Sequence, residues 1–468
     1  MAQYLYCMAD NKIWYPTLKY DDQPLYLQLV TAMAEAIDSG ELGPGDRLPP
    51  QRHIAWHLDV NLSTVTKAFQ QAAKQHLITG EVGRGTYVLG QSAEAELFRL
   101  KSTQRLPLID LSTHIPARKP RDQDLDKTLQ SIAKSPRGMG QYLDYLSPRQ
   151  LERIHHCAAQ WLKVLGYPCG AEECIASSCA HNALTNVLLA HGEKDKVVLV
   201  GEFTFPGMKA IAKQLGIKLH GVKMDEQGLC PESLDLAIRS TGSTLLVADT
   251  QLHNPTGTVT SKQREAALVK VIKKHAILLV EEFVIGALSE RPPLSRKLPK
   301  QSIIITSMAK SVAPGLRFAM TAGRHPLIEK MRKDTHANSW QLSPLMAEVA
   351  CRWIENGTAQ RRRKWQIREI EQRFALFRTV FSLPPRNNTN CSPHLWLRTK
   401  ECAEQTQTSL QQQGLVVVAG HLFAVGLPDN QYIRVSLTAA QSRPELRKAL
   451  TLLRNSNLIE LGEQSLNG

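Results

Sequence analysis

The sequence has no long run of apolar residues. Its uninterrupted apolar stretches are short, such as Val197–Val200 and Ile277–Val280, whereas a membrane-spanning helix needs about 18 consecutive apolar residues. The N-terminus also lacks the basic start and following apolar stretch of a secretory signal. We therefore expect a soluble, cytoplasmic protein that does not engage a membrane.

Paired cysteines are missing too. The nine cysteines are odd in number, and none forms a Cys-x-x-Cys pair. Cys169, Cys174 and Cys179 recur every five residues, a spacing that fits neither a zinc site nor a small disulfide scaffold. We expect no metal site, and we interpret the cysteines as reduced, mostly buried thiols.

The chain has 468 residues and a net charge of +14, but the charge is unevenly placed. Its length allows roughly two to four domains. Residues 1–90 hold 7 Lys/Arg and 9 Asp/Glu, a net of −2, while residues 91–468 hold 50 and 34, a net of +16. A DNA contact near the N-terminus must therefore depend on the local placement of cations rather than on overall charge.

Residues 23–90 show the pattern of three helices followed by a hairpin. Apolar residues at helical spacing, tight turns and a Gly-Arg-Gly tip mark the elements. The predicted elements are a helix ending at Ser39–Gly40, helices over Gln51–Leu58 and Ser63–Lys74, and strands over Leu77–Thr79 and Thr86–Leu89. This order is typical of a winged helix-turn-helix, whose third helix enters the major groove of DNA.

Candidate DNA contacts gather on the second and third predicted helices and at the hairpin tip. Hydroxyl side chains suit phosphates and bases, and Lys and Arg supply positive charge. The candidates are Arg47, Arg52, Ser63, Thr64, Thr66, Lys67 and Arg84. The helical pattern alone leaves open a dimerisation or docking module with ordinary surface hydroxyls.

Five short motifs make the N-terminal unit more specific. They read Pro24-Leu-Tyr-Leu-Gln-Leu, Gly45-Asp-Arg-Leu-Pro, Arg52, Thr64-Val65 and Gly83-Arg-Gly-Thr-Tyr-Val88. In residues and spacing they closely resemble the GntR winged-helix family over about residues 23–90, which implies binding to an operator in double-stranded DNA. That family often has a Ser-Arg pair where this sequence has Asn61-Leu62, so we expect a different strength or sequence preference of DNA binding.

From about residue 150, short apolar strands alternate with helices. The strands are predicted at Val197–Val200, Leu219–Lys223, Leu245–Ala248, Ile277–Val280 and Ile303–Thr306. Strands that are apolar on both faces favour a mostly parallel sheet covered by helices. We predict an α/β protein with a winged helix-turn-helix in residues 1–90, a linker in 91–127 and a large domain in 128–468, whose last part, from about 350, forms a smaller α+β lobe.

Lys310 lies just past the predicted strand Ile303–Thr306, with Ser307 three residues before it and Arg317 seven after. A lone lysine is usually a solvated surface charge. In this setting, however, the amine can form a Schiff base with an aldehyde cofactor while Ser307 and Arg317 hold a phosphate. Pyridoxal 5′-phosphate (PLP) needs both functions together.

Other residues fit the remaining contacts of PLP. Asn254 could bond the phenolic oxygen, Phe205 could stack on the ring, and Glu282 could pair with the ring nitrogen. Ser178, Cys179 and Ala180 precede an apolar helix whose free amides favour a phosphate. Arg434 could clamp the carboxylate of an amino-acid-like effector. Each residue alone is also compatible with a turn, core or surface position, so their order within one α/β domain carries the prediction.

That order closely resembles fold-type I aminotransferases across about residues 105–460. With the N-terminal unit, the whole chain resembles the MocR subfamily of GntR regulators. The resemblance implies that Lys310 forms the Schiff base, that the other residues take the roles just given, and that the protein is a head-to-tail, domain-swapped homodimer. It also implies that Tyr145 reaches the phosphate of the partner subunit.

Several departures from the family pattern cluster at this site. Glu282 is one methylene longer than the expected aspartate, and Val284 and Ile285 stand where a tyrosine is expected. Cys179 replaces a glycine, and Ala309 replaces a serine. We therefore expect a site that holds PLP but is poorly tuned for turnover.

Three functions remain open from the sequence. The first is a transcriptional regulator that senses an amino-acid-like or vitamin B6-related effector through Lys310. The alternative is a working PLP-dependent aminotransferase whose N-terminal domain is vestigial or serves dimerisation. A DNA-binding protein with an empty cofactor site is a third possibility.

The basic run Arg361-Arg-Arg-Lys364 has two interpretations. Its four cations wrap around a predicted helix, which fits an ordinary solvated surface. A second DNA contact would also explain the excess positive charge of the C-terminal part.

Overall fold

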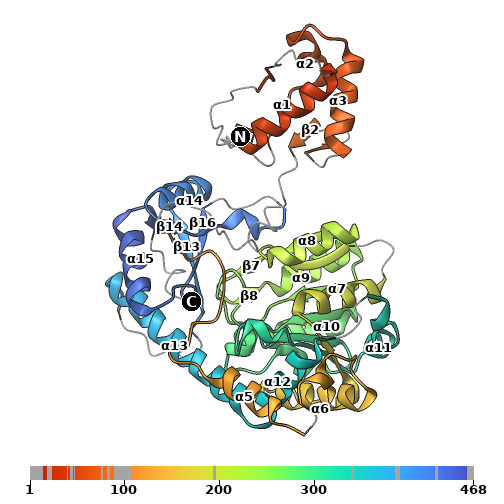
Figure 1. Cartoon of the computed structure of the whole chain (residues 1–468), viewed down its shortest axis with the longest axis vertical. Coiled ribbons are helices and arrows are strands. Elements are labelled where there is room, and N and C mark those ends of the chain that lie inside the picture. The colour runs from red at the N-terminus through yellow and green to blue at the C-terminus, as the bar shows by residue number, and fades with distance from the viewer. Residues whose placement is uncertain are drawn as a thin grey trace. The chain divides into compact units, whose positions relative to one another are not determined.

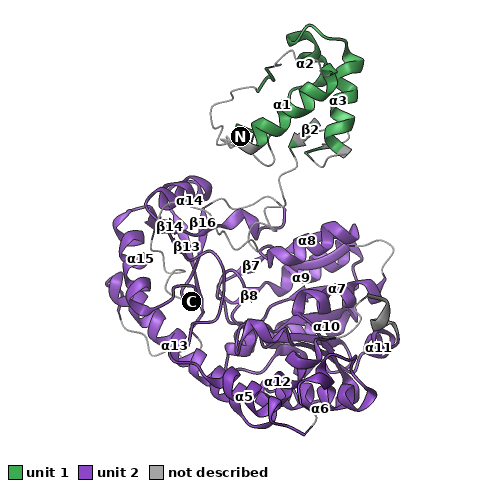
Figure 2. Cartoon of the chain, in the orientation of Figure 1, with its two compact units in different colours: residues 1–100 green, residues 101–468 purple. Residues whose placement is uncertain are grey.

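The structure, a computed structural model, divides the chain into two compact units, residues 1–100 and 101–468 (Figures 1 and 2). The described residues are 14–17, 24–39, 41–42, 46, 48–74, 77–81, 85–88, 108–136, 138–192, 197–338, 342–384, 391–426 and 431–460. Within these ranges, every helix is too short or too polar to cross a membrane.

The N-terminal unit contains the predicted three helices and hairpin. Its elements are α1 (Leu25–Ser39), α2 (Gln51–His57), α3 (Leu62–Lys74), β1 (Ile78–Glu81) and β2 (Gly85–Val88). The helices pack around Met33, Ile54 and Val65, all fully buried. The two strands pair antiparallel, with Ile78 opposite Val88. The winged helix-turn-helix prediction is confirmed.

The larger unit is built on a seven-stranded sheet. Its strand order is β4 (Cys174–Ser177), β12 (Ala319–Ala322), β11 (Ser302–Ser307), β10 (Leu278–Glu282), β9 (Leu245–Ala248), β5 (Val197–Gly201) and β6 (Lys218–Val222). Only β12 runs antiparallel to its neighbours β4 and β11; the other pairings are parallel. The predicted mostly parallel sheet is confirmed.

Helices cover both faces of this sheet (Figure 1). They are α6 (Pro148–Val164), α7 (Ala180–His191), α8 (Pro206–Leu215), α9 (Pro231–Thr241), α10 (Lys262–His275), α11 (Pro326–Asn338) and α12 (Pro344–Glu355). Alternate strand residues face different helices: Val198 and Val200 join the core with α7 and α8, whereas Leu199 joins the core with α9 and α10. This two-sided burial explains the nearly continuous apolar runs in the sequence.

The C-terminal part forms the predicted smaller lobe. It comprises α13 (Thr358–Val380), β13 (His394–Thr399), α14 (Ala403–Gln412), β14 (Leu415–Val416), β15 (Val418–Ala419), β16 (Tyr432–Ser436), α15 (Arg443–Asn455) and β17 (Ile459–Glu460). Four of these strands form a sheet in the order β15-β16-β13-β17. One face of the sheet packs on α13 and α15 through a core that includes Phe377 and Leu450.

The linker predicted over residues 91–127 is too long. Residues 108–127 belong to the larger unit, where β3 (Ile109–Asp110) pairs with β14 and α5 (Asp124–Ala133) begins. Ala117 exchanges two hydrogen bonds with the Gln366 side chain of α13, 3.1 and 2.7 Å long. These contacts join positions 249 residues apart in the sequence, so a local pattern could not predict them.

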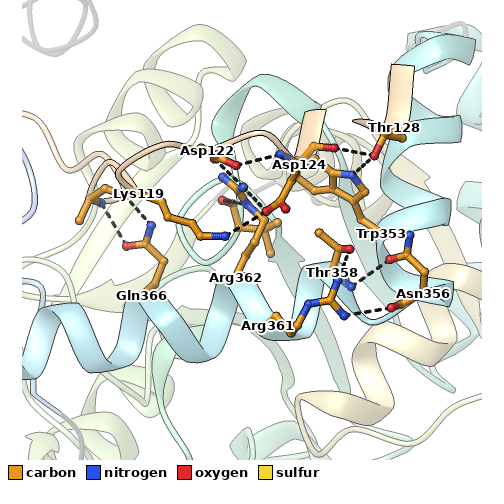
Figure 3. A network of polar contacts seen from close by, with 12 residues as sticks. Lys119, Asp122, Asp124, Thr128, Trp353, Asn356, Thr358, Arg361, Arg362 and Gln366 are labelled. Atoms are coloured by element: carbon orange, nitrogen blue, oxygen red, sulfur yellow. Dashed lines mark hydrogen bonds and ion pairs between the residues drawn. The ribbon is translucent and has the colours of Figure 1, made fainter. Parts of the chain in front are cut away.

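The three arginines of the run 361–364 hold the stretch 108–127 and nearby loops of the larger unit in place, and Figure 3 shows Arg361 and Arg362 with their partners. Arg362 forms ion pairs with Asp122 (2.6 Å) and Asp124 (2.8 Å) and lies over the Trp353 ring. Arg361 donates to Thr358 and to the Asn356 main chain. Arg363 donates to two main-chain oxygens, those of residues 287 and 289. All three arginines therefore have intramolecular partners. Lys364 is exposed and fits the interpretation of an ordinary solvated surface.

Replacing Arg362 with alanine should lower the free energy of unfolding by about 2 kcal/mol, because Asp122 and Asp124 both lose their ion pair with it. Among the described residues, only Asp124 keeps a second cation, Lys119. We expect a lower midpoint of urea denaturation, followed by tryptophan fluorescence. Lys364→Ala is the matched control on the same helix and should leave the midpoint unchanged. Equal midpoints for the two variants would contradict this account of Arg362.

The described cysteines are free thiols, as expected, but the expectation that most are buried is wrong. Three are buried (Cys157, Cys174 and Cys351), and the other five are partly exposed. The Sγ atoms of Cys169 and Cys174 lie 3.5 Å apart and share a hydrogen bond, not a disulfide bond.

Candidate functional site

Lys310 lies just beyond the carboxyl end of the buried strand β11. Its Nζ donates a hydrogen bond to the main-chain oxygen of His114, 2.5 Å away. Burial lowers the pKa of Lys310 to about 8, and the positive charges of Arg434 and Arg317 add to this shift. Near neutral pH, part of this amine is therefore uncharged, which is the form that attacks a carbonyl carbon.

Arg434 extends from β16 into the same site and is only 5% exposed. One guanidinium nitrogen donates to Oδ1 of Asn254 (2.9 Å) and another to the main-chain oxygen of Ser112 (2.6 Å). The guanidinium also lies over the Phe423 ring, 4.8 Å from its centroid. Nε is buried and has no hydrogen-bond partner among the described residues. Burial lowers the pKa of Arg434 to about 10, so it remains a buried cation suited to a carboxylate.

Two acidic side chains lie next to each other at the ends of β9 and β10. Ala248 pairs with Glu281 in the sheet, which places Asp249 beside Glu282. Burial raises the pKa of Glu282 to about 7. Burial, followed by the charge of Glu282, also raises the pKa of Asp249. A cation placed beside this pair would favour its ionised form.

The structure distinguishes the two consecutive glutamates of β10. Glu281 is fully buried and accepts hydrogen bonds from the Thr250 hydroxyl and from the main-chain nitrogens of Leu294 (2.9 Å) and Ser295 (2.7 Å). These bonds give Glu281 a structural role. Glu282 therefore remains the candidate acid of the predicted cofactor site.

Ser307 and the start of α7, both predicted to bind the phosphate, lie at the same end of the sheet, where β11 and β4 end. Ser307 of β11 is opposite Ala319 of β12, and Ala319 is in turn opposite Ser177 of β4. With neighbouring strands about 4.8 Å apart, this register brings Ser307 near the start of α7. That start is formed by Ser178, Cys179 and Ala180.

Two of these residues already have hydrogen-bond partners. The Ser307 hydroxyl donates to the Phe318 main chain (3.2 Å) and accepts from the Ala309 amide (3.1 Å). Sγ of Cys179 caps α7 by accepting a bond from the Asn182 amide (3.4 Å). Arg317 is exposed. The N-terminus of α7 is a further feature that can favour an anion here.

Among the described contacts of Lys310, none involves Phe205 or Tyr145. Phe205 is partly buried at the start of α8, and its ring fills the space beside Gly207, where a Cβ would lie 2.1 Å from a ring carbon. Tyr145 is 75% exposed. Ile285 packs in an apolar cluster with Leu252, so no hydroxyl is offered from that position.

The sequence did not predict the part played by residues 112–114. Ser112 and His114 bind the two key cations through main-chain oxygens. His394, at the start of β13, lies against His114 with 5.9 Å between ring centroids. A single histidine in a stretch without periodicity gives no indication in the sequence that it lies at a binding site.

A family model described as "Aminotransferase class I and II" matches residues 108–453. The chain belongs to the class I and II aminotransferase family. A second model, "Bacterial regulatory proteins, gntR family", matches residues 25–88. A GntR unit followed by an aminotransferase-family domain is the MocR arrangement that the sequence predicts, and it implies DNA binding.

Curated relatives share both parts of the chain. HTH-type transcriptional regulator YdeF of Bacillus subtilis (strain 168) is 26% identical over 451 residues, which are 94% of this chain and 96% of the relative. Vitamin B6 salvage pathway transcriptional repressor PtsJ of Salmonella typhimurium (strain LT2) is 25% identical over 419 residues, 88% of this chain and 94% of the relative.

Solved aminotransferase structures share the fold. An archaeal alanine:glyoxylate aminotransferase has a TM-score of 0.67 at 17% identity, covering 78% of this chain and 94% of its own. LysN, the α-aminoadipate aminotransferase of Thermus thermophilus, has a TM-score of 0.68 at 16% identity, covering 78% of this chain and 95% of its own. The fold-type I prediction is confirmed.

The cofactor of this aminotransferase-family chain is PLP, and the residues present fit it. When bound, PLP supplies an aldehyde that reacts with primary amines. Lys310 would provide the amine, and Glu282 would provide a buried acid for the ring nitrogen. Because Oδ1 of Asn254 accepts from Arg434, the amide nitrogen of Asn254 would be the atom that donates to the phenolic oxygen.

The rate at which PLP attaches to Lys310 should rise with pH and level off above about pH 8. Only the uncharged amine attacks the aldehyde, and its fraction grows as the pH approaches the lowered pKa of Lys310. Stopped-flow absorbance after mixing with PLP measures this rate. A rate still rising steeply at pH 10 would show an ordinary lysine and contradict the lowered pKa.

The candidate DNA surface is partly described. Arg52 and Ser63 are exposed, and Thr64 is partly buried. Asn61 caps α3, because its Oδ1 accepts from the Ser63 amide at 3.0 Å. Leu62, 49% exposed, stands beside it at the start of the helix.

Two further candidates on α3 make contacts within the unit. The Thr66 hydroxyl donates to Gln51 (2.9 Å) and so links α3 to α2. Lys67 is exposed, with its Nζ 4.0 Å from the centroid of the Tyr26 ring. Arg47 and Arg84 lie outside the described residues.

Proposed function

We propose that this chain is a PLP-dependent transcriptional regulator that binds operator DNA and senses an amino-acid-like or vitamin B6-related effector at Lys310. It would act in the cytoplasm as a domain-swapped homodimer. The observation that carries the proposal is the attachment of both key cations, Lys310 and Arg434, to the segment 112–114, in a chain that begins with a GntR unit.

Ligands at this site compete with the bonds that hold residues 112–114. A Lys310 nitrogen joined to an aldehyde carbon would keep at most one N–H, so its hydrogen bond to His114 would be lost or redirected. A carboxylate on Arg434 competes for the N–H groups that now bind Ser112 and Asn254. Occupancy therefore changes the restraints on a segment that continues, through residues 101–107, toward the N-terminal unit. An effector shifts DNA binding only as far as its affinities for the two states differ.

The relatives support this proposal. PtsJ, which matches both parts of the chain, is named a repressor of vitamin B6 salvage. This name favours a regulator with a B6-related effector over an enzyme with a purely metabolic role. The exposed ring of Tyr145 supports a dimer in which each subunit completes the phosphate site of the other.

A working aminotransferase remains the second candidate, since the lowered pKa of Lys310 favours a reactive amine. Sustained formation of a 2-oxo acid by the wild type, absent in Lys310→Ala, would support it. The apolar Ile285 and the raised pKa of Glu282 argue for slow chemistry.

DNA binding is tested with the full-length protein, the DNA upstream of its own gene and a random duplex of equal length. We expect tighter binding to the upstream DNA and an affinity that falls with salt, since phosphate contacts release counterions. Lys67→Ala should reduce the slope of log affinity against log salt by about 1. Lys364→Ala is the control and should keep the wild-type slope. Equal affinity for both duplexes would overturn the proposal, and a reduced slope in Lys364→Ala would revive the second DNA contact.

A further inference from the structure

Two histidines beside Lys310 leave buried nitrogens without partners. His114 is 5% exposed and His394 is 1% exposed. Both ring nitrogens of His114, and Nδ1 of His394, have no hydrogen-bond partner among the described residues. The two rings meet edge to face, with 5.9 Å between their centroids. A buried polar atom left without a partner is destabilising, so a ligand that satisfies these atoms gains affinity.

These imidazoles belong to the site rather than to the protein core alone. The main chain of His114 accepts the hydrogen bond from Lys310. Burial, followed by the nearby charge of Lys310, keeps the pKa of His114 well below its usual value, and His394 and Arg434 add to the shift. The His114 ring therefore lies close enough to Lys310 and Arg434, the two groups that would meet the ligand, to feel their charges.

Both rings are neutral, and each has a defined hydrogen-bonding role. Burial lowers the pKa of His394 to about 3. Its Nε2 lies 3.2 Å from the main-chain oxygen of His253, so Nε2 carries the hydrogen and Nδ1 is a bare acceptor. A neutral His114 offers one donor and one acceptor. Together the rings present both kinds of partner and no charge.

We propose that His114 and His394 recognise an uncharged hydrogen-bonding group of the effector, a hydroxyl or a carboxamide, while Arg434 holds its carboxylate. The inference rests on the proposed function and narrows its effector class. An aliphatic side chain would leave the imidazole nitrogens unpaired. A second carboxylate would place an anion against the bare acceptor of His394. A site built to hydrogen-bond a ligand discriminates strongly against an analogue that lacks the polar group.

Isosteric amino acids test this directly in the full-length, PLP-loaded protein. L-Asparagine, L-leucine and L-aspartate share one shape, as do L-threonine and L-valine, and calorimetry gives the dissociation constant of each. We expect asparagine or threonine to bind at least about tenfold more tightly than its aliphatic isostere. Aspartate should bind more weakly than asparagine.

Variants of His114 assign the preference to the ring. In His114→Phe the ratio between isosteres should fall to about 1, while His114→Gln, which keeps a donor and an acceptor, should retain part of it. His156→Phe, at an exposed histidine of α6, is the control and should keep the wild-type ratio. General damage to the site would weaken both members of a pair and leave the ratio unchanged.

Four results would overturn the inference: equal binding of isosteres by the wild type, an unchanged ratio in His114→Phe, tightest binding of aspartate, or binding of none of the five amino acids. DNA affinity measured on the same samples separates this inference from the proposed function. Amino acids that change DNA affinity without an isostere preference would leave the regulator intact and remove the role of the histidines. An isostere preference without any change in DNA affinity would keep the role of the histidines and remove the proposed regulator.

Discussion

Replacing Lys310 with alanine should abolish the visible absorption band that PLP gives with the wild-type protein. It should also abolish every effect of PLP on DNA binding. Lys310 is the amine that the site presents, and burial lowers its pKa to about 8, which keeps it reactive. Absorption spectra before and after addition of PLP measure the effect.

Lys330→Ala is a suitable control for this loss. The Lys330 amine also donates to a main-chain oxygen, that of Ala190, but on the exposed surface of α11. We expect this variant to give the full wild-type band. A full band in Lys310→Ala would mean that another amine binds the cofactor, and the assignment of Lys310 would be wrong.

Replacing Arg434 with alanine should weaken the binding of carboxylate ligands by about 100-fold, since losing one partner of a hydrogen-bonded charge costs roughly 2–5 kcal/mol. The wild type should prefer L-leucine to L-leucinamide, which lacks the carboxylate. Arg434→Ala should lose this preference, as measured by calorimetry.

Arg434→Lys separates charge from geometry. It keeps the positive charge but not the planar fork that binds Asn254 and Ser112, so we expect an intermediate preference. The ratio between leucine and leucinamide is insensitive to general damage, which affects both. A preference that survives in Arg434→Ala would show that the carboxylate binds elsewhere.

The fold could be predicted wherever short-range chemistry decides it. Turn residues and apolar spacing defined the winged helix, and two-sided apolar strands defined the sheet. The stretch over residues 108–128 could not be predicted in this way. Its structure depends on Gln366, on Arg362 and on pairing with β14, all more than 200 residues away.

The sequence predicts site residues where they fall into a recognisable order. The structure brings Lys310, Asn254 and Arg434 together as that order implied. His114 and His394 were missed because an isolated histidine carries no spacing signal, and only the fold shows that their nitrogens lack partners. The raised pKa of Glu282 likewise arises from burial, which the order of residues does not show.

The central claim is that occupancy of the Lys310 site changes DNA binding. The most direct measurement is the affinity of the full-length protein for its upstream DNA, first without PLP, then with PLP, and then with PLP and an amino acid. We predict a change of about fivefold or more at one of these steps, the usual lower range of allosteric coupling, and no change in Lys310→Ala. One constant affinity under all conditions would contradict the account and leave the large unit as a scaffold beneath a DNA-binding domain.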